Sequence, residues 1–203
     1  MKGIFKLLAV SSFVAMAVAN ASWPSSAPNA GESVRVQGDQ AAAKFDGKAW
    51  TSGRVKIDTA LPVGYNAPTP IDAIEIKTYP SVRRADFESS NLWASDWFGQ
   101  SRAFWALFDH IKTRKIDMTS PVEMTYRNVQ QGFWGPKADS WAMSFLYRTP
   151  ELGPVGPAEN GVTVVDSEVV TVISVGVEGG MGLDLVQRGL DILRKALGSQ
   201  TTW

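Results

Sequence analysis

The sequence predicts an α+β fold with two helices over one sheet, and three observations carry this prediction. A helical stripe at 104–111 runs directly into a strand-like stretch at 116–122. Later, β-branched stretches at 162–165 and 169–177 lead into a second helical stripe at 183–197. Both halves present strands followed by a helix, which indicates a pseudo-twofold repeat with a ligand groove between helices and sheet.

Residues 1–21 are predicted to be a signal peptide. Lys2 and Lys6 give a positive start, an apolar stretch follows at 7–18, and Ala-Asn-Ala at 19–21 fits a cleavage site. The apolar stretch is short for a membrane span, which needs roughly 18 apolar residues, although an uncleaved anchor is an alternative. We expect an exported protein, periplasmic or secreted, with no transmembrane span in the mature chain.

Charge and cysteine content exclude several classes of function. Lys2 and Lys6 belong to the signal, so 18 of the 20 basic residues remain against 20 acidic ones, which argues against nucleic acid. The chain has no Cys, which excludes disulfides, thiolate catalysis and covalent c-type haem. With 44% hydrophobic residues, the mature chain can be held by its own core.

The elements are predicted in chain order from composition and periodicity. Residues 22–68 are rich in Ser, Pro, Ala and Gly and are expected to be flexible, with short strands at 34–36 and 54–57 as candidates. Alternation then predicts strands at 72–79 and 82–90. A helix follows, because four apolar residues share one stripe: Phe104, Leu107, Phe108 and Ile111.

The second half repeats this order. Strands at 162–165 and 169–177 precede a helix whose stripe ends at Gly198. A shift of 88 places Ile74 on Val162, and a shift of 86 places Phe104 on Leu190. The common order of elements supports the repeat more strongly than these apolar matches do.

The end of the first helix and the next strand carry a specific pattern. Residues 107–111 read Leu-Phe-Asp-His-Ile, 115–122 read Lys-Ile-Asp-Met-Thr-Ser-Pro-Val, and 74–80 read Ile-Glu-Ile-Lys-Thr-Tyr-Pro. They are similar to the LF-x-Y-I, K-I-x-M-T-x-P-V and Y-E-I/V-R-x-Y-P segments of the SOUL haem-binding family. The resemblance covers 69–203.

This resemblance implies a distorted antiparallel β-barrel of two ββαβ-type repeats with two long helices. It also implies non-covalent binding of haem or another tetrapyrrole. Two departures stand out: the connection at 112–114 lacks the family's Gly-rich loop, and the sequence stops at Trp203, where the family continues into a further strand. We therefore expect the last strand to be missing, or the strands at 34–57 to cover an otherwise open edge.

His110 is the only histidine and hence the only candidate iron ligand of that type. The alternative is a structural residue at the edge of the core, with one ring nitrogen hydrogen-bonded to backbone or water. The family usually has Tyr at this position, so the resemblance does not imply that His110 binds iron. Met118, Met124 and Met143 are candidates for thioether contacts, for an axial iron ligand or for core packing. Arg83 follows the turn at Pro80. It is either a hydrogen-bond donor to a haem propionate or a charge exposed to solvent at the sheet edge. The predicted cofactor contacts are Arg83, Phe104, Phe108, His110, Met118 and Met124.

The leading functional hypothesis is an exported, non-enzymatic haem- or tetrapyrrole-binding protein with a mainly hydrophobic groove. The chain lacks G-x-S-x-G, G-x-G-x-x-G and Walker patterns. One alternative is a small-molecule effector-binding or hydrolytic relative that would use Glu123, Tyr126 or Tyr147. Another is a structural envelope protein that contacts a partner through exposed tryptophans, for which Trp105 and Trp134 are candidates.

Overall fold

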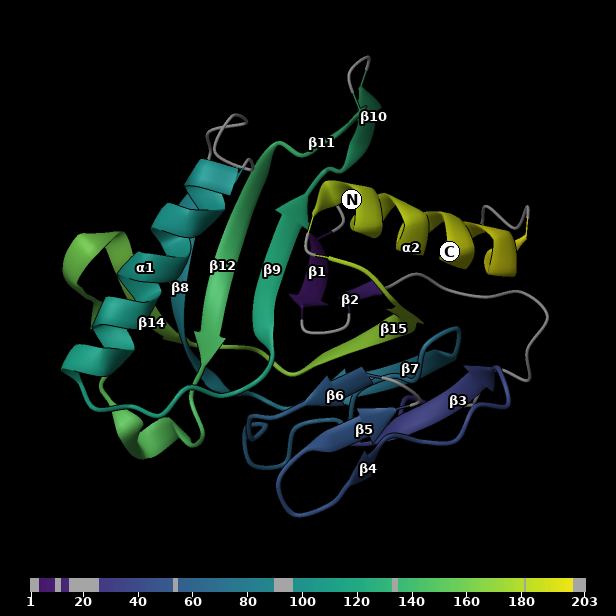
Figure 1. Ribbon diagram of the computed structural model, residues 1–203, viewed down its shortest axis with the longest axis horizontal. Coiled ribbons are helices and arrows are strands. Elements are labelled where there is room, and N and C mark those ends of the chain that lie inside the picture. The colour runs from purple at the N-terminus through teal and green to yellow at the C-terminus, as the bar shows by residue number, and fades with distance from the viewer. Residues whose placement is uncertain are drawn as a thin grey trace. The chain divides into compact units, whose positions relative to one another are not determined.

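The computed structural model confirms an α+β fold with antiparallel strands and two α-helices among the residues that it describes (Figure 1). The chain divides into two compact units. Unit 1 contains 1–10, 59–63 and 81–168, and unit 2 contains 11–58, 64–80 and 169–203. The described residues are 4–9, 12–14, 26–52, 55–89, 97–132, 135–180 and 182–198.

Unit 1 is built on a sheet in the order β13-β14-β8-β12-β9-β1, with every neighbouring pair antiparallel. A separate hairpin joins β10 (Gln130–Gly132) to β11 (Gly135–Lys137). The sheet strands are β1 (Ile4–Ala9), β8 (Arg83–Ser89), β9 (Val122–Arg127), β12 (Ser140–Leu146), β13 (Gly156–Pro157) and β14 (Val162–Asp166).

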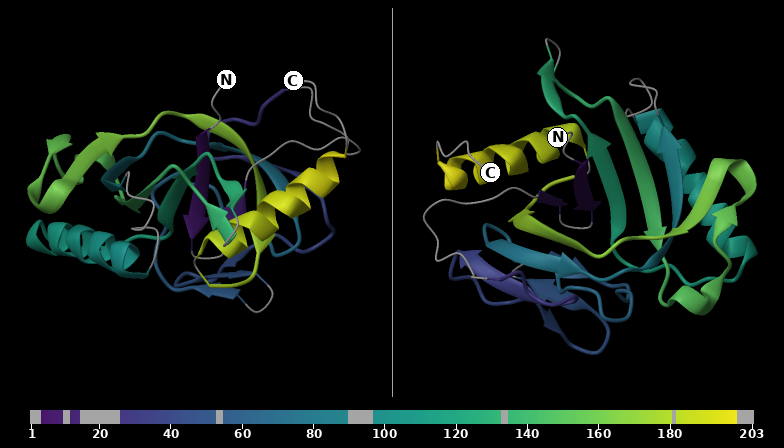
Figure 2. Two further views of the ribbon diagram at one scale, coloured as in Figure 1. Left: turned by 90° about the horizontal axis from the view of Figure 1, so that it is seen from above. Right: turned by 180° about the vertical axis from the view of Figure 1, so that it is seen from behind.

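Helix α1 (Trp97–Thr113) covers one face of this sheet, where it contacts β8, β12 and β14 (Figure 2). Leu107 and Ile111 of the predicted stripe are buried. The Phe104 ring meets the Phe145 ring of β12 edge-on, with centroids 5.4 Å apart. Since side chains alternate along a strand, Trp141 and Met143 share the face of Phe145 toward the helix. This apolar layer is the core of unit 1.

Unit 2 has a sheet in the order β2-β15-β7-β3, covered by helix α2 (Leu183–Leu197). The α2 stripe buries Leu185, Val186, Leu190 and Leu193. A separate three-stranded sheet has the order β4-β5-β6. The strands are β2 (Ser12–Val14), β3 (Ser33–Gln37), β4 (Lys44–Phe45), β5 (Trp50–Ser52), β6 (Val55–Ile57), β7 (Ile74–Tyr79) and β15 (Val170–Val177).

None of the sheets formed by the described strands closes into a barrel, and the pseudo-twofold repeat is not confirmed. β13 and β3 each pair with a single described strand, so the sheets end there. β8 pairs with β12 and β14, while β7 pairs with β3 and β15. The partner of each strand therefore depends on contacts between residues far apart in the chain. The alternation of apolar and polar residues within one strand does not specify that partner.

The predicted signal peptide and the predicted flexible segment 22–68 both contain strands in the structure. β1 and β2 lie within the predicted signal peptide, and the predicted cleavage site at 19–21 is outside the described residues. β3 to β6 lie within the segment 22–68. No helix in the described part of the chain is long and apolar enough to cross a membrane.

Candidate functional site

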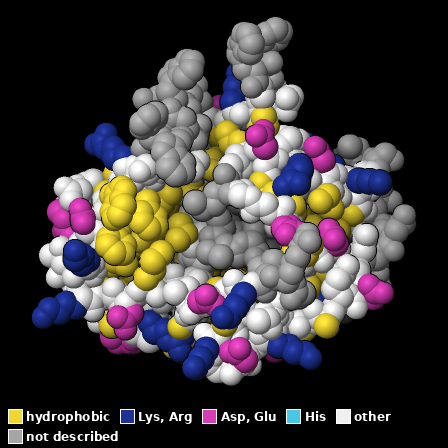
Figure 3. Space-filling view, in the orientation of Figure 1, with side chains coloured by type: hydrophobic (Ala, Val, Ile, Leu, Met, Phe, Trp, Pro, Cys, Tyr) yellow, Lys and Arg dark blue, Asp and Glu magenta, His cyan; other side chains and the backbone are white. Residues whose placement is uncertain are grey.

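Three aromatic side chains of α1 form a surface that we call the α1 aromatic surface: Phe104, Trp105 and Phe108. The Phe104 and Phe108 rings are stacked, with centroids 6.0 Å apart and planes at 11°. The Trp105 ring meets both edge-on, at centroid distances of 5.6 and 5.7 Å. Figure 3, in the orientation of Figure 1, shows hydrophobic side chains (yellow) clustered over α1.

The helical period explains this surface. Leu107 and Ile111 point to the sheet, whereas Phe104 and Phe108 lie at the edge of the stripe and are only half-buried. Trp105 is turned further outward and is 57% exposed. One exposed aromatic ring beside two half-buried rings can contact an apolar ligand.

Charged residues of both signs flank the surface on the helix. Arg102 lies three residues before Trp105, and Lys112 lies four residues after Phe108, so both are neighbours on the helix exterior. Both side chains are exposed, as is Asp109. The surface can therefore receive a flat apolar ring whose polar groups reach Arg102 or Lys112.

On the side of α1 that faces the sheet, the described side chains expose no groove. Ala103 and Leu107 have no exposed surface, and Ala106 and Ile111 are buried. These four side chains therefore offer almost no accessible surface to a porphyrin. Among the described side chains of α1, Trp105 is the most exposed aromatic ring, and it faces outward.

His110 is fully buried, and both of its ring nitrogens have partners. Nδ1 is 3.1 Å from a Glu159 carboxylate oxygen, and Nε2 is 2.7 Å from the Tyr147 hydroxyl. A carboxylate can only accept, so Nδ1 carries the proton and Nε2 accepts from the Tyr147 O–H. Iron ligation would require Nε2 to give up Tyr147.

The surroundings keep His110 neutral. Burial lowers its pKa first, the Arg114 charge lowers it further, and Glu159 acts in the opposite direction. Arg114 ion-pairs with Glu159, and this pairing lowers the pKa of Glu159 to about 2. These hydrogen bonds and the ion pair join α1 to the segment before β14. We therefore interpret His110 as a structural residue.

Arg83 is committed to a neighbouring strand. Its Nε and Nη2 donate to the two carboxylate oxygens of Asp166, both at 2.8 Å, and Nη1 donates to the carbonyl of Gly153. The hydrogen bond from Arg83 lowers the pKa of Asp166. These contacts leave little of the guanidinium for a propionate.

The predicted methionines do not line the α1 aromatic surface. Met124 and Met143 are opposite each other in the β9–β12 register, and both are buried. Met118, in the connection before β9, is half-buried. Of the six predicted contacts, only Phe104 and Phe108 are thus brought together, and Trp105 joins them. Trp134 and the side chain of Trp97 lie outside the described parts of the chain.

The side chains that a hydrolytic relative would use are all buried: Glu123, Tyr126 and Tyr147. Glu123 accepts from Arg84 at 2.9 Å, and Arg84 also ion-pairs with Asp86 at 3.0 Å. Burial raises the pKa of Tyr126 to about 12, so this phenol stays protonated near neutral pH. We therefore interpret these three side chains as parts of the buried core and not as catalytic groups.

Unit 2 contains an ionic group that periodicity does not reveal. Lys77 is fully buried on β7, 3.3 Å from Glu75, which Arg35 also contacts at 2.9 Å. The Lys77 ammonium also donates to the carbonyl of Ala67. Burial lowers the pKa of Lys77 to about 8, partly offset by the Glu75 charge.

This burial predicts that the protein becomes more stable as the pH rises from about 8 toward 10. In this range the unfolded Lys77 still binds a proton and the folded one does not, so the free energy of unfolding increases, by up to about 3 kcal/mol. Urea unfolding at pH 7.5 and 10 measures the change. In Lys77→Met the rise should vanish, and an equal rise in both proteins would contradict the assignment. Above pH 10 the raised pKa of Tyr126 acts in the opposite direction.

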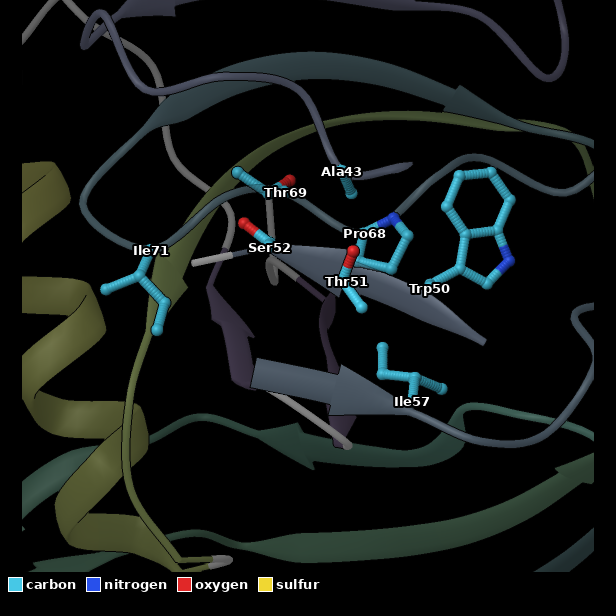
Figure 4. A pocket seen from close by; sticks show the side chains of 8 residues that line it. All are labelled: Ala43, Trp50, Thr51, Ser52, Ile57, Pro68, Thr69 and Ile71. Atoms are coloured by element: carbon cyan, nitrogen blue, oxygen red, sulfur yellow. The ribbon is translucent and has the colours of Figure 1, made fainter. Parts of the chain in front are cut away.

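Unit 2 also has an open cavity of about 460 Å³. A slot of about 10 Å³, room for one water molecule, shares Ser52 and Ile71 with it. Figure 4 shows Trp50 and Ile57 of the three-stranded sheet at one side of the slot, and Thr69 and Ile71 at the other. The larger cavity is lined by Gln40, Ala41, Ser52, Pro70, Ile71, Asp72 and Glu178.

The two carboxylates make this cavity unsuited to an anionic tetrapyrrole, because Asp72 and Glu178 would repel propionates. The α1 aromatic surface is therefore the better candidate for such a ligand. Among the described residues no group of three or more His, Asp or Glu side chains could hold a metal ion.

Comparison of the chain with family models, curated proteins and solved structures finds no match.

Proposed function

We propose that this protein is an exported, non-enzymatic binder of haem or a related tetrapyrrole, and that the ring lies on the α1 aromatic surface. The exposure of Trp105 beside the stacked Phe104 and Phe108 rings carries the proposal. Flat aromatic ligands gain both apolar burial and ring contacts on such a surface. The resemblance of the residues after α1 to the SOUL pattern supports the same ligand class.

The side chains present fit the ring of the cofactor better than its iron. The two nitrogens of His110 are engaged, and Met124 is packed in the core. Binding would then come from apolar contact and from Arg102 or Lys112 reaching the carboxylates of the ligand. When bound, haem would supply its own redox and ligand-binding chemistry, and the protein would hold and orient it.

Titration of the processed protein with hemin, followed by the Soret band, should give a saturable shift at micromolar protein. Trp105→Ala and Phe108→Ala are each expected to weaken binding by at least about tenfold, which corresponds to about 1.4 kcal/mol. Iron-free protoporphyrin should bind with similar affinity, because the α1 aromatic surface, as defined by its three described side chains, contains no His or Met.

Two matched controls sharpen this experiment. Phe45→Ala removes an exposed aromatic ring from unit 2, and Arg83→Gln removes a cation that is committed to Asp166. Neither should change hemin affinity. The proposal fails if the wild type shows no saturable shift. A protein partner captured through Trp105 without porphyrin binding would instead favour the structural envelope role.

A second candidate function rests on the acidic cavity of unit 2. Its volume suits a small ligand, and Asp72 and Glu178 favour a cationic one. An aliphatic diamine is a suitable probe in a thermal-shift titration. Asp72→Asn is the informative variant, because Asn tolerates the positive φ of 62° at this position while removing the charge.

A further inference from the structure

Strand β9 lies between two strands of unit 1. β12 pairs with it on one side, and β1 pairs with it along its full length on the other, from Ile4 opposite Arg127 to Ala9 opposite Val122. Figure 1 shows β1, the purple strand near the N-terminus, beside β9. The first five residues of β9 are buried.

The partner on that second side belongs to the segment 1–21, which we expect to be removed on export. The inference therefore rests on the export part of the proposed function, although not on the tetrapyrrole part. When β1 is removed, the β9 backbone N–H and C=O groups that face it lose their hydrogen-bond partners. An open, regular edge of this kind is a template for another strand.

We propose that the processed protein presents the outer edge of β9 as a seat for an extended segment of a partner polypeptide, which adds as an antiparallel strand. Strand addition of this type uses main-chain hydrogen bonds for affinity and alternate side chains for selection. We call this edge the β9 seat, and it spans Val122–Arg127.

The residues of β9 define the chemistry of the partner. Val122, Met124 and Tyr126 alternate with Glu123 and Thr125, so one face of the seat is apolar and the other is polar. Residues directly opposite each other on paired strands lie on the same face. The partner strand should therefore carry apolar residues at every second position.

The chain's own first strand shows this pattern in place. In the observed register Phe5 is opposite Tyr126, Leu7 is opposite Met124, and Ala9 is opposite Val122. The pairing runs through six residues without a register shift, and so does the pairing of β9 with β12. β9 contains no proline or bulge that would blunt its edge.

The test uses the processed protein, purified after export, and a fluorescent synthetic peptide of residues 2–14. We expect saturable binding and a higher melting temperature. A peptide with Leu7→Pro and Leu8→Pro should bind at least about tenfold more weakly, because one of these two neighbouring N–H groups must face β9. The unprocessed chain, whose own β1 fills the seat, should also bind the peptide at least about tenfold more weakly.

Hydrogen exchange locates the site. The amides of 122–127 should gain protection when the peptide is added to the processed protein. Equal binding of both peptides, or protection elsewhere only, would overturn the β9 seat. A concentration-dependent dimer that excludes the peptide would also overturn it, because a second copy would then occupy the edge.

N-terminal sequencing of the exported protein separates this proposal from the tetrapyrrole proposal. If residues 1–21 are retained, β1 fills the edge permanently and the β9 seat is refuted, whereas hemin binding is unaffected. If hemin fails to bind and the peptide binds, only the tetrapyrrole proposal is lost.

Discussion

Gly176→Ala is expected to destabilise the protein by at least about 3 kcal/mol, because no space exists for a side chain at this position on β15. An ideal Cβ would lie 2.1 Å from the carbonyl oxygen of Pro70 and 2.8 Å from that of Thr69. Both contacts are to backbone, which cannot move as a side chain does. The substitution must push the segment before β7 away from β15.

Local hydrogen bonds would be lost with that movement. The Gly176 N–H donates to the carbonyl of Ala73 at 3.1 Å, and the Asp72 N–H donates to the carbonyl of Gly176 at 2.9 Å. Urea unfolding of the variant measures the loss. Gly153→Ala is the matched control, since its Cβ would meet only the Tyr147 ring, at 3.6 Å. Equal stability of both variants would show that the close approach to Pro70 is not what constrains this position.

His110→Ala is expected to cost about 3–5 kcal/mol of unfolding free energy. The substitution empties a fully buried site and leaves the Tyr147 hydroxyl without its partner. Asp109→Ala, at the exposed neighbouring position, should change stability by less than about 0.5 kcal/mol. If both substitutions cost the same, the buried network contributes little.

The same network predicts a loss of stability in acid. Because the pKa of His110 is lowered, the unfolded chain binds a proton below about pH 6.5 while the folded protein does not. The free energy of unfolding should then fall with decreasing pH, by at most about 1.4 kcal/mol per pH unit from this group. His110→Gln should remove this slope between pH 6.5 and 4.5. Below that range the lowered pKa of Glu159 adds a further loss.

Local periodicity predicted the parts of the fold that local interactions decide. Hydrogen bonds of a helix join residues four apart, so the stripe through Leu107 and Ile111 specifies both the helix and its buried face. The α2 stripe through Leu190 and Leu193 is buried in the same way. For the same reason the aromatic residues at the edge of the α1 stripe could be named as candidate contacts in advance.

The partners of buried polar side chains could not be predicted. Alternation on β7 places Glu75 and Lys77 on the face opposite Ile74 and Ile76, and a polar face of a strand is ordinarily expected to meet solvent. Both side chains are buried in the structure. Whether the second face of a strand is buried depends on the segments that cover it, and the strand's own sequence does not specify them. The contact of His110 with Tyr147 joins residues 37 apart, and no pattern in the sequence links them.

The sequence by itself determined the two helices, the α+β class and the aromatic character of α1. Tertiary structure alone decided that β8 pairs with β14, that β7 pairs with β15, and that His110 is enclosed rather than open to a ligand. A helix closes its hydrogen bonds within a few residues of chain, whereas a strand takes its partner from any part of the chain. Pairing and enclosure therefore exist only once the distant segments have met.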